Sequence, residues 1–192
     1  MKTVLINRED RPERLRESLS HLSGFGLEPD VFPAILGGWK GCRDSHIAVL
    51  SKYRTEEHVF ILEDDVLFLS DPTKIWQKIA TQLPTDFDML YFGISPNQPC
   101  RRVSDNLFRV YGGLTTHAIL WHNRQGGVVE YILKHGEIKN KWDVFLNNEI
   151  LPKFKCYVVY PLCATQRETG QSDTCKRSDV RSIVRNYNRF VK

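Results

Sequence analysis

The sequence has 192 residues, 41% hydrophobic and 26% charged, so it can form one domain with a sizeable core but is too short for two ordinary domains. Its net charge of +4 and isoelectric point near 8.8 fall below what a nucleic-acid-binding arm carries, which favours an anionic small molecule as partner and no nucleic acid. No apolar run approaches the roughly 20 residues of a membrane span, and no hydrophobic leader follows Met1. We expect one globular domain over residues 1–192.

The cysteine content indicates a reducing compartment. The number of cysteines is odd, and no two are spaced as Cys-x-x-Cys, so neither a disulfide framework nor a zinc motif is predicted. Reduced, mostly buried thiols are typical of cytoplasmic proteins, and we expect a cytoplasmic location. The five cysteines are Cys42, Cys100, Cys156, Cys163 and Cys175.

The first half of the chain alternates between strand and helix signals. Leu15, Leu19 and Leu22 share one face of an expected helix, and Pro12 suits its first turn. Alternation of this kind predicts an α/β fold with a mostly parallel central sheet flanked by helices. The expected elements are strand 2–6, helix 12–22, strand 31–35, a helix after Gly37-Gly38 that carries Ile47 and Leu50, strand 58–62, a helix from Pro72 to about residue 82, and strand 89–92.

The second half has a more mixed pattern. It predicts strands near 107–110, 117–121 and 156–160, a helix over about 124–135, another helix starting near Asp143, and a basic C-terminal helix over about 179–192. Neither an internal repeat nor a linker interrupts the chain, which again indicates one domain.

An acidic triplet follows the strongest expected strand, the apolar run HVFIL over 58–62. Open α/β sheets bind ligands at the carboxyl ends of their strands, where Glu63, Asp64 and Asp65 lie. Adjacent carboxylates raise one another's pKa, and Mn²⁺ or Mg²⁺ would compensate their charge. In an extended segment Glu63 and Asp65 would face one side and Asp64 the other. A solvated acidic turn, a receiver-type phosphoacceptor domain, a phosphatase and a two-metal nuclease share this feature.

Polar residues elsewhere could complete an anion site. Ser45 and His46 belong to the helix after the glycine turn, where a hydroxyl and a helix N-terminus can meet an anion, although a histidine here could also be structural. Arginine suits phosphate through its forked donors, and solvated surface charge is the alternative for Arg8 and Arg14. The residues expected to contact a nucleotide at the end of the first strand are Asn7, Arg8, Arg11 and Arg14.

Ordered motifs along nearly the whole chain resemble glycosyltransferase family 25, the group of lipooligosaccharide and procollagen galactosyltransferases. The resemblance implies a GT-A-type fold and metal-dependent inverting transfer of a hexose, galactose or glucose, from a UDP-sugar. It implies a hydroxyl acceptor on a glycan, a glycolipid or a collagen-like protein. The motifs are Ile6-Asn7-Arg8, 10–14, Gly41-Cys42-Arg43-Asp44-Ser45-His46, 60–65, 88–93, Thr116-His117-Ala118, Trp142-Asp143, 161–166 and Ser172-Asp173.

The resemblance also assigns roles. The acidic triplet corresponds to the family's D-x-D-like element, with Glu63 and Asp65 as metal ligands, Asp64 facing the donor, and Asp65 the most important residue. Asp143 is the candidate catalytic base because GT-A enzymes place an acidic residue at a helix in this half; a helix N-cap is the alternative. The residues expected to close over the donor, with polar loop structure as the alternative, are Gln166, Ser172 and Asp173. Thr174 follows Ser172-Asp173 where the family has an aliphatic residue, which puts local packing in doubt.

Two other functions share these features. A metal-dependent phosphohydrolase or nuclease would use the same acidic strand end, but the sequence places no second acidic cluster for a two-metal site. A non-catalytic relative would bind a nucleotide-sugar without turnover, which the intact triplet and Asp143 argue against.

The C-terminal helix carries a basic stripe beside an apolar one. Arg181, Arg185 and Arg189 recur every four residues. Either the apolar side packs on the domain and the arginines are solvated, or the stripe holds the protein peripherally on an anionic membrane. The expected apolar stripe consists of Val180, Val184, Tyr187 and Val191.

Overall fold

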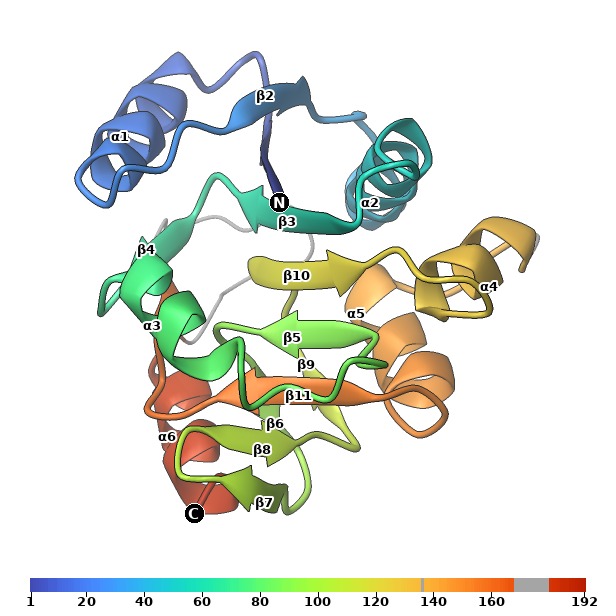
Figure 1. Cartoon of the computed structure of the whole chain (residues 1–192). Coiled ribbons are helices and arrows are strands. Elements are labelled where there is room, and N and C mark those ends of the chain that lie inside the picture. The colour runs from blue at the N-terminus through green and yellow to red at the C-terminus, as the bar shows by residue number, and fades with distance from the viewer. Residues whose placement is uncertain (136, 168–179) are drawn as a thin grey trace.

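An eight-stranded sheet runs through the computed structural model, which describes residues 1–135, 137–167 and 180–192 (Figure 1). Its strand order is β2-β1-β3-β10-β5-β11-β8-β7. Six strands share one direction, while β10 and β8 are antiparallel to their neighbours, so the sheet is mixed with one predominant direction. The strands are β1 (Lys2–Asn7), β2 (Asp30–Pro33), β3 (His58–Glu63), β5 (Met89–Tyr91), β7 (Arg101–Ser104), β8 (Leu107–Arg109), β10 (Ala118–His122) and β11 (Cys156–Val159).

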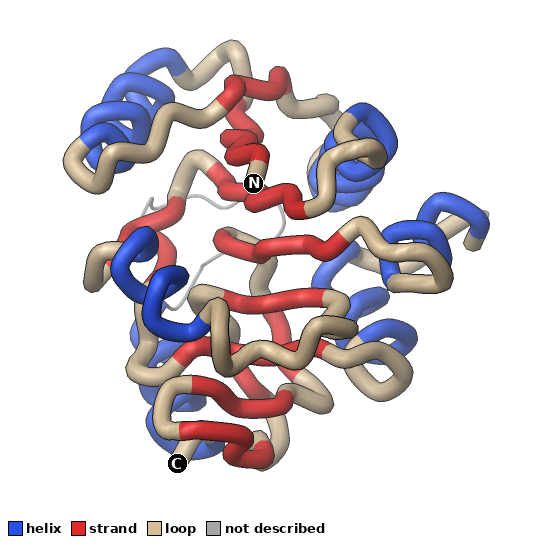
Figure 2. Tube along the Cα trace, in the orientation of Figure 1, coloured by secondary structure: helices blue, strands red, loops and turns tan. Residues whose placement is uncertain are grey.

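Helices cover both faces of this sheet (Figure 2). Alternate side chains of β3 enter two cores: Val59 and Ile61 pack on one face, Phe60 and Leu62 on the other. Burial on both faces explains why the strand reads as a continuous apolar run. One face is covered by α1 (Pro12–Ser23) and α3 (Pro72–Ile79); the other by α2 (Trp39–Lys52), α4 (Val128–Lys134), α5 (Trp142–Phe145) with the π-helical η1 (Leu146–Ile150), and α6 (Val180–Phe190).

Two small ladders, which the sequence patterns did not predict, complete the described strands. One joins β4 (Val66–Phe68) to β12 (Ala164–Gln166), and the other joins β6 (Ser95–Pro96) to β9 (Gly113–Leu114). In the first ladder Gln166 pairs with Val66. This register brings Gln166 beside the acidic triplet, although the two are far apart in sequence.

Most predicted elements are found, with one clear shift. The helix expected over 124–135 begins only at Val128, because Gly126 has a φ of 67° and Gly127 is the N-cap. The carboxylate of Asp88 accepts a hydrogen bond from the Val128 amide at 3.1 Å and so fixes this start. At α3 the expected cap is confirmed, since Asp71 accepts hydrogen bonds from Thr73 and Lys74.

The cysteines and helices add two findings. No disulfide joins the four cysteines that lie within the described residues, and Cys156 and Cys163 are buried as expected. Within residues 1–135, 137–167 and 180–192, no helix combines the length and hydropathy needed to cross a bilayer.

Candidate functional site

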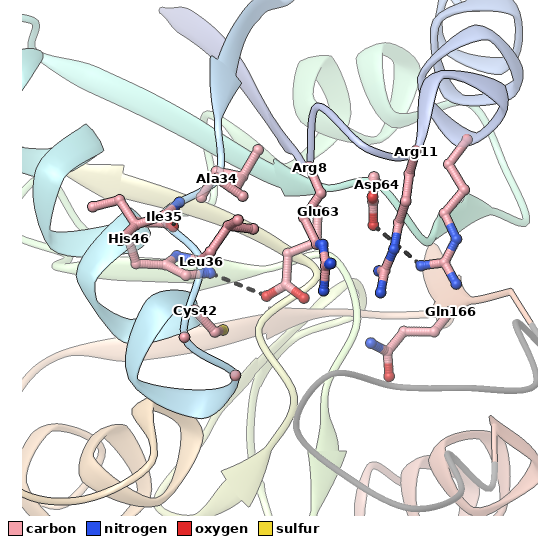
Figure 3. A pocket seen from close by; sticks show the side chains of 15 residues that line it. Arg8, Arg11, Ala34, Ile35, Leu36, Cys42, His46, Glu63, Asp64 and Gln166 are labelled. Atoms are coloured by element: carbon pink, nitrogen blue, oxygen red, sulfur yellow. Dashed lines mark hydrogen bonds and ion pairs between the residues drawn. The ribbon is translucent and has the colours of Figure 1, made fainter.

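A cleft opens where β1 and β3 end side by side (Figure 3). The parallel register places Ile6 opposite Glu63, so Arg8 and Asp64, which follow the two strands, emerge at the same edge of the sheet. Ligands of open α/β sheets bind at such an edge. The cleft is lined by Ile6, Arg8, Arg11, Arg14, Ala34, Ile35, Leu36, Gly37, Gly38, Cys42, Ser45, His46, Glu63, Asp64 and Gln166.

Glu63 is the most strongly hydrogen-bonded carboxylate of the cleft. Its Oε1 is 3.0 Å from His46 Nε2 and accepts a hydrogen bond from Thr116 Oγ1 at 2.5 Å. Burial raises the pKa of Glu63, but the hydrogen bonds and charge of His46 and the Thr116 hydroxyl lower it more, so the pKa lies below its ordinary value. The His46 ring stacks on Trp142 with centroids 5.6 Å apart. Glu63 is therefore an ionised, positioned carboxylate.

The chain turns directly after β3. Glu63 is the last strand residue, Asp64 and Asp65 form the turn, and β4 begins at Val66. The predicted alternation, with Glu63 and Asp65 on one side, is therefore wrong: a turn does not keep the period of two that an extended strand has. Glu63 and Asp64 line the cleft together, and Asp65 lies outside that lining.

Asp65 has the environment least compatible with a carboxylate. Burial, then the charges of Glu63 and Asp64, raise its pKa well above the ordinary value of 3.8. Its Oδ2 accepts a hydrogen bond from Gln166 Nε2 at 2.9 Å. Its Oδ1 is buried and has no hydrogen-bond partner among the described residues. A buried, unsatisfied oxygen beside two other carboxylates is the setting in which a bound cation would relieve the repulsion.

Arginines of the β1–α1 segment face the carboxylates. Figure 3 shows Arg8 and Arg11 on the side of the cleft where Glu63 and Asp64 lie. Arg14 Nη1 is 3.6 Å from Asp64 Oδ1, and both side chains are largely buried. Arg8 forms a two-pronged contact with Asp10, at 2.9 and 2.6 Å. The cleft thus presents forked donors and carboxylates to one volume, as a metal-bound diphosphate would require.

Two predicted residues are engaged in holding the backbone. Ser45 Oγ donates to the Gly41 carbonyl at 2.7 Å and accepts from the Ile35 amide at 2.8 Å, so its hydroxyl joins segment 35–38 to α2. Asn7 is buried, and its Nδ2 donates to the Arg8 carbonyl at 2.7 Å. Both shape the cleft wall, and direct contact with a nucleotide stays a prediction for each.

Gly41 allows segment 35–38 to lie against α2. A Cβ at Gly41 would stand 2.1 Å from the Ile35 carbonyl oxygen, which is backbone and cannot turn away. We expect Gly41→Ala to destabilise the fold by about 1–3 kcal/mol through overpacking. Urea unfolding checks this, with Gly24→Ala as control, because a Cβ there would approach the His21 carbonyl oxygen only to 3.3 Å. Equal stability of both variants would contradict the tight contact.

Asp143 lies near the carboxylates without lining the cleft. It is the second residue of α5, whose N-cap is Lys141, so the alternative reading as the N-cap is wrong. Its Oδ1 accepts a hydrogen bond from the Val144 amide at 2.9 Å. Burial, opposed by this hydrogen bond, and the charge of Glu63 raise its pKa. Of the residues expected to close over the donor, Gln166 lines the cleft, and Ser172 and Asp173 lie outside the described residues.

Sequence reasoning missed three residues of this region. One ligand atom each from Cys42, His46 and Glu63 lies within 4.8 Å of the others, a grouping able to hold a metal ion (Figure 3). The spacing of Cys42 and His46, four residues apart on one helix, was the available signal. Thr116 hydrogen-bonds Glu63, and the preceding Thr115 has a φ of 80°, which is strained for a β-branched residue. Nothing in a single sequence shows that strain.

Comparisons with known proteins bear on the fold. A scan against protein-family models finds no match to the sequence, and a search of curated proteins finds none. The solved structure of protein A197 from STIV has a TM-score of 0.58 to this chain at 12% identity, covering 86% of this chain and 85% of that one. A similarity at this identity shows a shared fold.

Two further structures match less closely. Mannose-1-phosphate geranyltransferase from Thermus thermophilus has a TM-score of 0.45 at 14% identity, covering 83% of this chain and 74% of that one. A mutant of Drosophila beta-1,4-galactosyltransferase 7, in complex with manganese, UDP-Gal and xylobiose, has a TM-score of 0.48 at 12% identity, covering 96% and 79%. The chain therefore has an α/β, GT-A-like fold with a mixed central sheet flanked by helices, as predicted.

Proposed function

We propose that this protein is a metal-dependent glycosyltransferase that transfers a hexose from a UDP-sugar to a hydroxyl acceptor. The observation that carries the proposal is the meeting of Arg8, Arg11 and Arg14 with the carboxylates of Glu63 and Asp64 in one cleft at the strand ends. Guanidinium groups bind the diphosphate of a nucleotide-sugar, and carboxylates hold the divalent cation that accompanies it. The ordered family 25 motifs support the same reaction.

The donor set suits Mn²⁺ or Mg²⁺. We assign Glu63 and Asp65 as the ligands, because both supply hard oxygen atoms and Asp65 Oδ1 is buried without a hydrogen-bond partner among the described residues. The cation, when bound, neutralises charge on the departing diphosphate. His46 and Thr116 hold Glu63 in place, and Gln166 holds Asp65. Such support of a ligand's orientation is typical of metal sites.

Asp143 is our candidate for the base that accepts the acceptor's proton. Its raised pKa makes the carboxylate a better proton acceptor than an ordinary aspartate. Its hydrogen bond to the Val144 amide fixes the side chain at the start of α5. Proton removal by Asp143 and inversion at the anomeric carbon belong to one in-line displacement.

Incubation with a panel of UDP-sugars and Mn²⁺, with UDP release as readout, tests the function. We expect release that disappears on chelation and rises when a glycan acceptor is added. Release from UDP-galactose but not UDP-glucose, or the reverse, would identify the sugar, since one hydroxyl distinguishes the two. Hydrolysis of phosphomonoesters or nucleic acid would indicate the phosphohydrolase or nuclease alternative, and UDP binding without release would indicate a non-catalytic protein.

The structure of α6 bears on membrane attachment. Ile183, Tyr187 and Val191 are buried against the protein, whereas Val184 is 38% exposed, so the predicted apolar stripe is corrected by one position. The Tyr187 hydroxyl also donates to the Val159 carbonyl. The apolar face is therefore occupied, and Arg181, Arg185 and Arg189 are exposed.

We expect only weak, salt-sensitive binding to anionic vesicles. Three arginines supply about 3 kcal/mol together before screening, and stable anchoring needs a second signal, which the packed apolar face does not offer. Co-sedimentation with anionic and neutral vesicles at low and physiological salt checks this. Attachment at physiological salt that is lost when the three arginines are replaced by glutamine would contradict the expectation and place the acceptor at a membrane.

A further inference from the structure

Three potential metal ligands meet at the end of the sheet opposite the cleft. His58 is the first residue of β3, whereas the cleft lies beyond its last residue, Glu63. In the antiparallel β3–β10 pair, His58 lies directly opposite His122 (Figure 1). One ligand atom from each of Glu57, His58 and His122 lies within 4.8 Å of the other two. No predicted site residue belongs to this group.

The two imidazoles are held side by side on rigid elements. Their ring centroids are 4.7 Å apart, and the ring planes differ by 30°. Phe87 stacks on His58 at 5.6 Å and 9°, and contacts the His122 ring at 4.8 Å. Side chains fixed by strand pairing and aromatic packing lose little conformational freedom when they bind an ion.

The hydrogen bond of His122 selects its tautomer. Its Nδ1 lies 2.9 Å from the Phe87 carbonyl oxygen, which can only accept, so Nδ1 carries the hydrogen. The lone pair of Nε2 is then available to a metal. Histidine ligands in metal sites usually donate their other ring N–H to a carbonyl or carboxylate in this way.

The third side chain supplies negative charge and access. Glu57 Oε2 is 3.7 Å from His58 Nδ1, and the Glu57 side chain is 78% exposed, so an ion can enter from solvent. Burial, followed by the charge of His122, lowers the pKa of His58. His58 is therefore neutral at neutral pH, as a metal ligand must be.

We propose that Glu57, His58 and His122 form a second metal site, for a late first-row divalent ion such as Zn²⁺. Two imidazole nitrogens and one carboxylate suit zinc, copper or nickel better than Mn²⁺ or Mg²⁺. Three protein ligands leave a fourth tetrahedral position for water. A bound ion would tie the start of β3 to the end of β10, at the edge of the sheet farthest from the carboxylates of the cleft.

Metal titration of the full-length protein, freed of metal by a chelator, tests the site. Zn²⁺ is titrated calorimetrically, and Co²⁺ serves as a spectroscopic probe. A Cys42→Ser background removes the thiol of the cleft, so a thiolate-to-cobalt band marks binding there and its absence marks binding by imidazole. We expect one bound Zn²⁺ in this background, weakened at least tenfold by His122→Gln or Glu57→Gln. His135→Gln, at an exposed histidine outside the group, should have no effect.

The outcome is decisive even if a histidine variant fails to fold. Glu57 is exposed, so Glu57→Gln should fold normally and still weaken Zn²⁺ binding. Zn²⁺ affinity in Glu57→Gln and in folded His122→Gln equal to that of the His135→Gln control would overturn the proposal. Because the readout is Zn²⁺ affinity, the result does not depend on whether the cleft transfers sugar.

Discussion

Replacing Asp65 by asparagine should remove most Mn²⁺-supported binding of UDP and, with it, transferase activity. Asparagine keeps the shape of the side chain and can still pair with Gln166, whose amide hydrogen-bonds Asp65 at 2.9 Å. The variant lacks the negative charge that a divalent ligand set requires. We expect UDP affinity in the presence of Mn²⁺ to fall by about 10-fold to 100-fold or more. Calorimetric titration of UDP with and without Mn²⁺ measures this.

The same substitution should stabilise the metal-free protein. The pKa of Asp65 is raised in the folded state, so above its ordinary value of 3.8 the folded protein binds more protons than the unfolded chain. Stability therefore falls as pH rises through this range, and the full penalty is present above the raised pKa. Asp65→Asn removes the penalty, and we expect a gain of about 1 kcal/mol at neutral pH.

A control variant separates these effects from a general loss of charge. Asp105 lies in an exposed turn, with its side chain 90% exposed, and Asp105→Asn should change neither UDP binding nor stability measurably. Unchanged Mn²⁺-dependent affinity in Asp65→Asn would refute the assignment of Asp65 as a ligand. Lower thermal stability of metal-free Asp65→Asn would refute the account of its environment.

The elements that bury a clear apolar pattern were predictable from the sequence. The run before Glu63 reads as a strand buried on two faces, and Pro12 and Asp71 mark the starts of helices that the structure contains. The carboxylates and arginines were expected together because parallel strands end at one edge of a sheet. The alternating pattern indicated the predominant strand direction.

What the sequence could not supply depends on contacts between distant segments. Strands as short as β4 and β12 carry too few residues for a periodic pattern, yet their pairing brings Gln166 to Asp65. The turn after Glu63 is set by where the ladder ends, and three acidic residues give no sign of it. His46 reads as a lone helix histidine until the fold brings its ring to Glu63 and Trp142.

Asp143→Asn tests the catalytic base. The amide oxygen of asparagine can still accept the hydrogen bond from the Val144 amide, so α5 should begin where it does now and the thermal stability should change little. The variant cannot take up a proton from the acceptor hydroxyl. We expect turnover to fall by about 10²-fold or more, while UDP-sugar binding stays close to that of the natural protein. Steady-state kinetics and UDP-sugar titration together measure the two quantities.

The pH profile adds a readout that a structural role would not move. A base must be ionised, so turnover should fall as pH drops through the pKa of Asp143, which burial and the charge of Glu63 raise above its ordinary value of 3.8. This acidic limb should disappear in Asp143→Asn and persist in the control Glu149→Gln, which alters a carboxylate on η1 that pairs with Lys153. Normal turnover in Asp143→Asn would reduce Asp143 to a hydrogen-bond acceptor for the first turn of α5, and the base would have to be sought among the other carboxylates of the cleft.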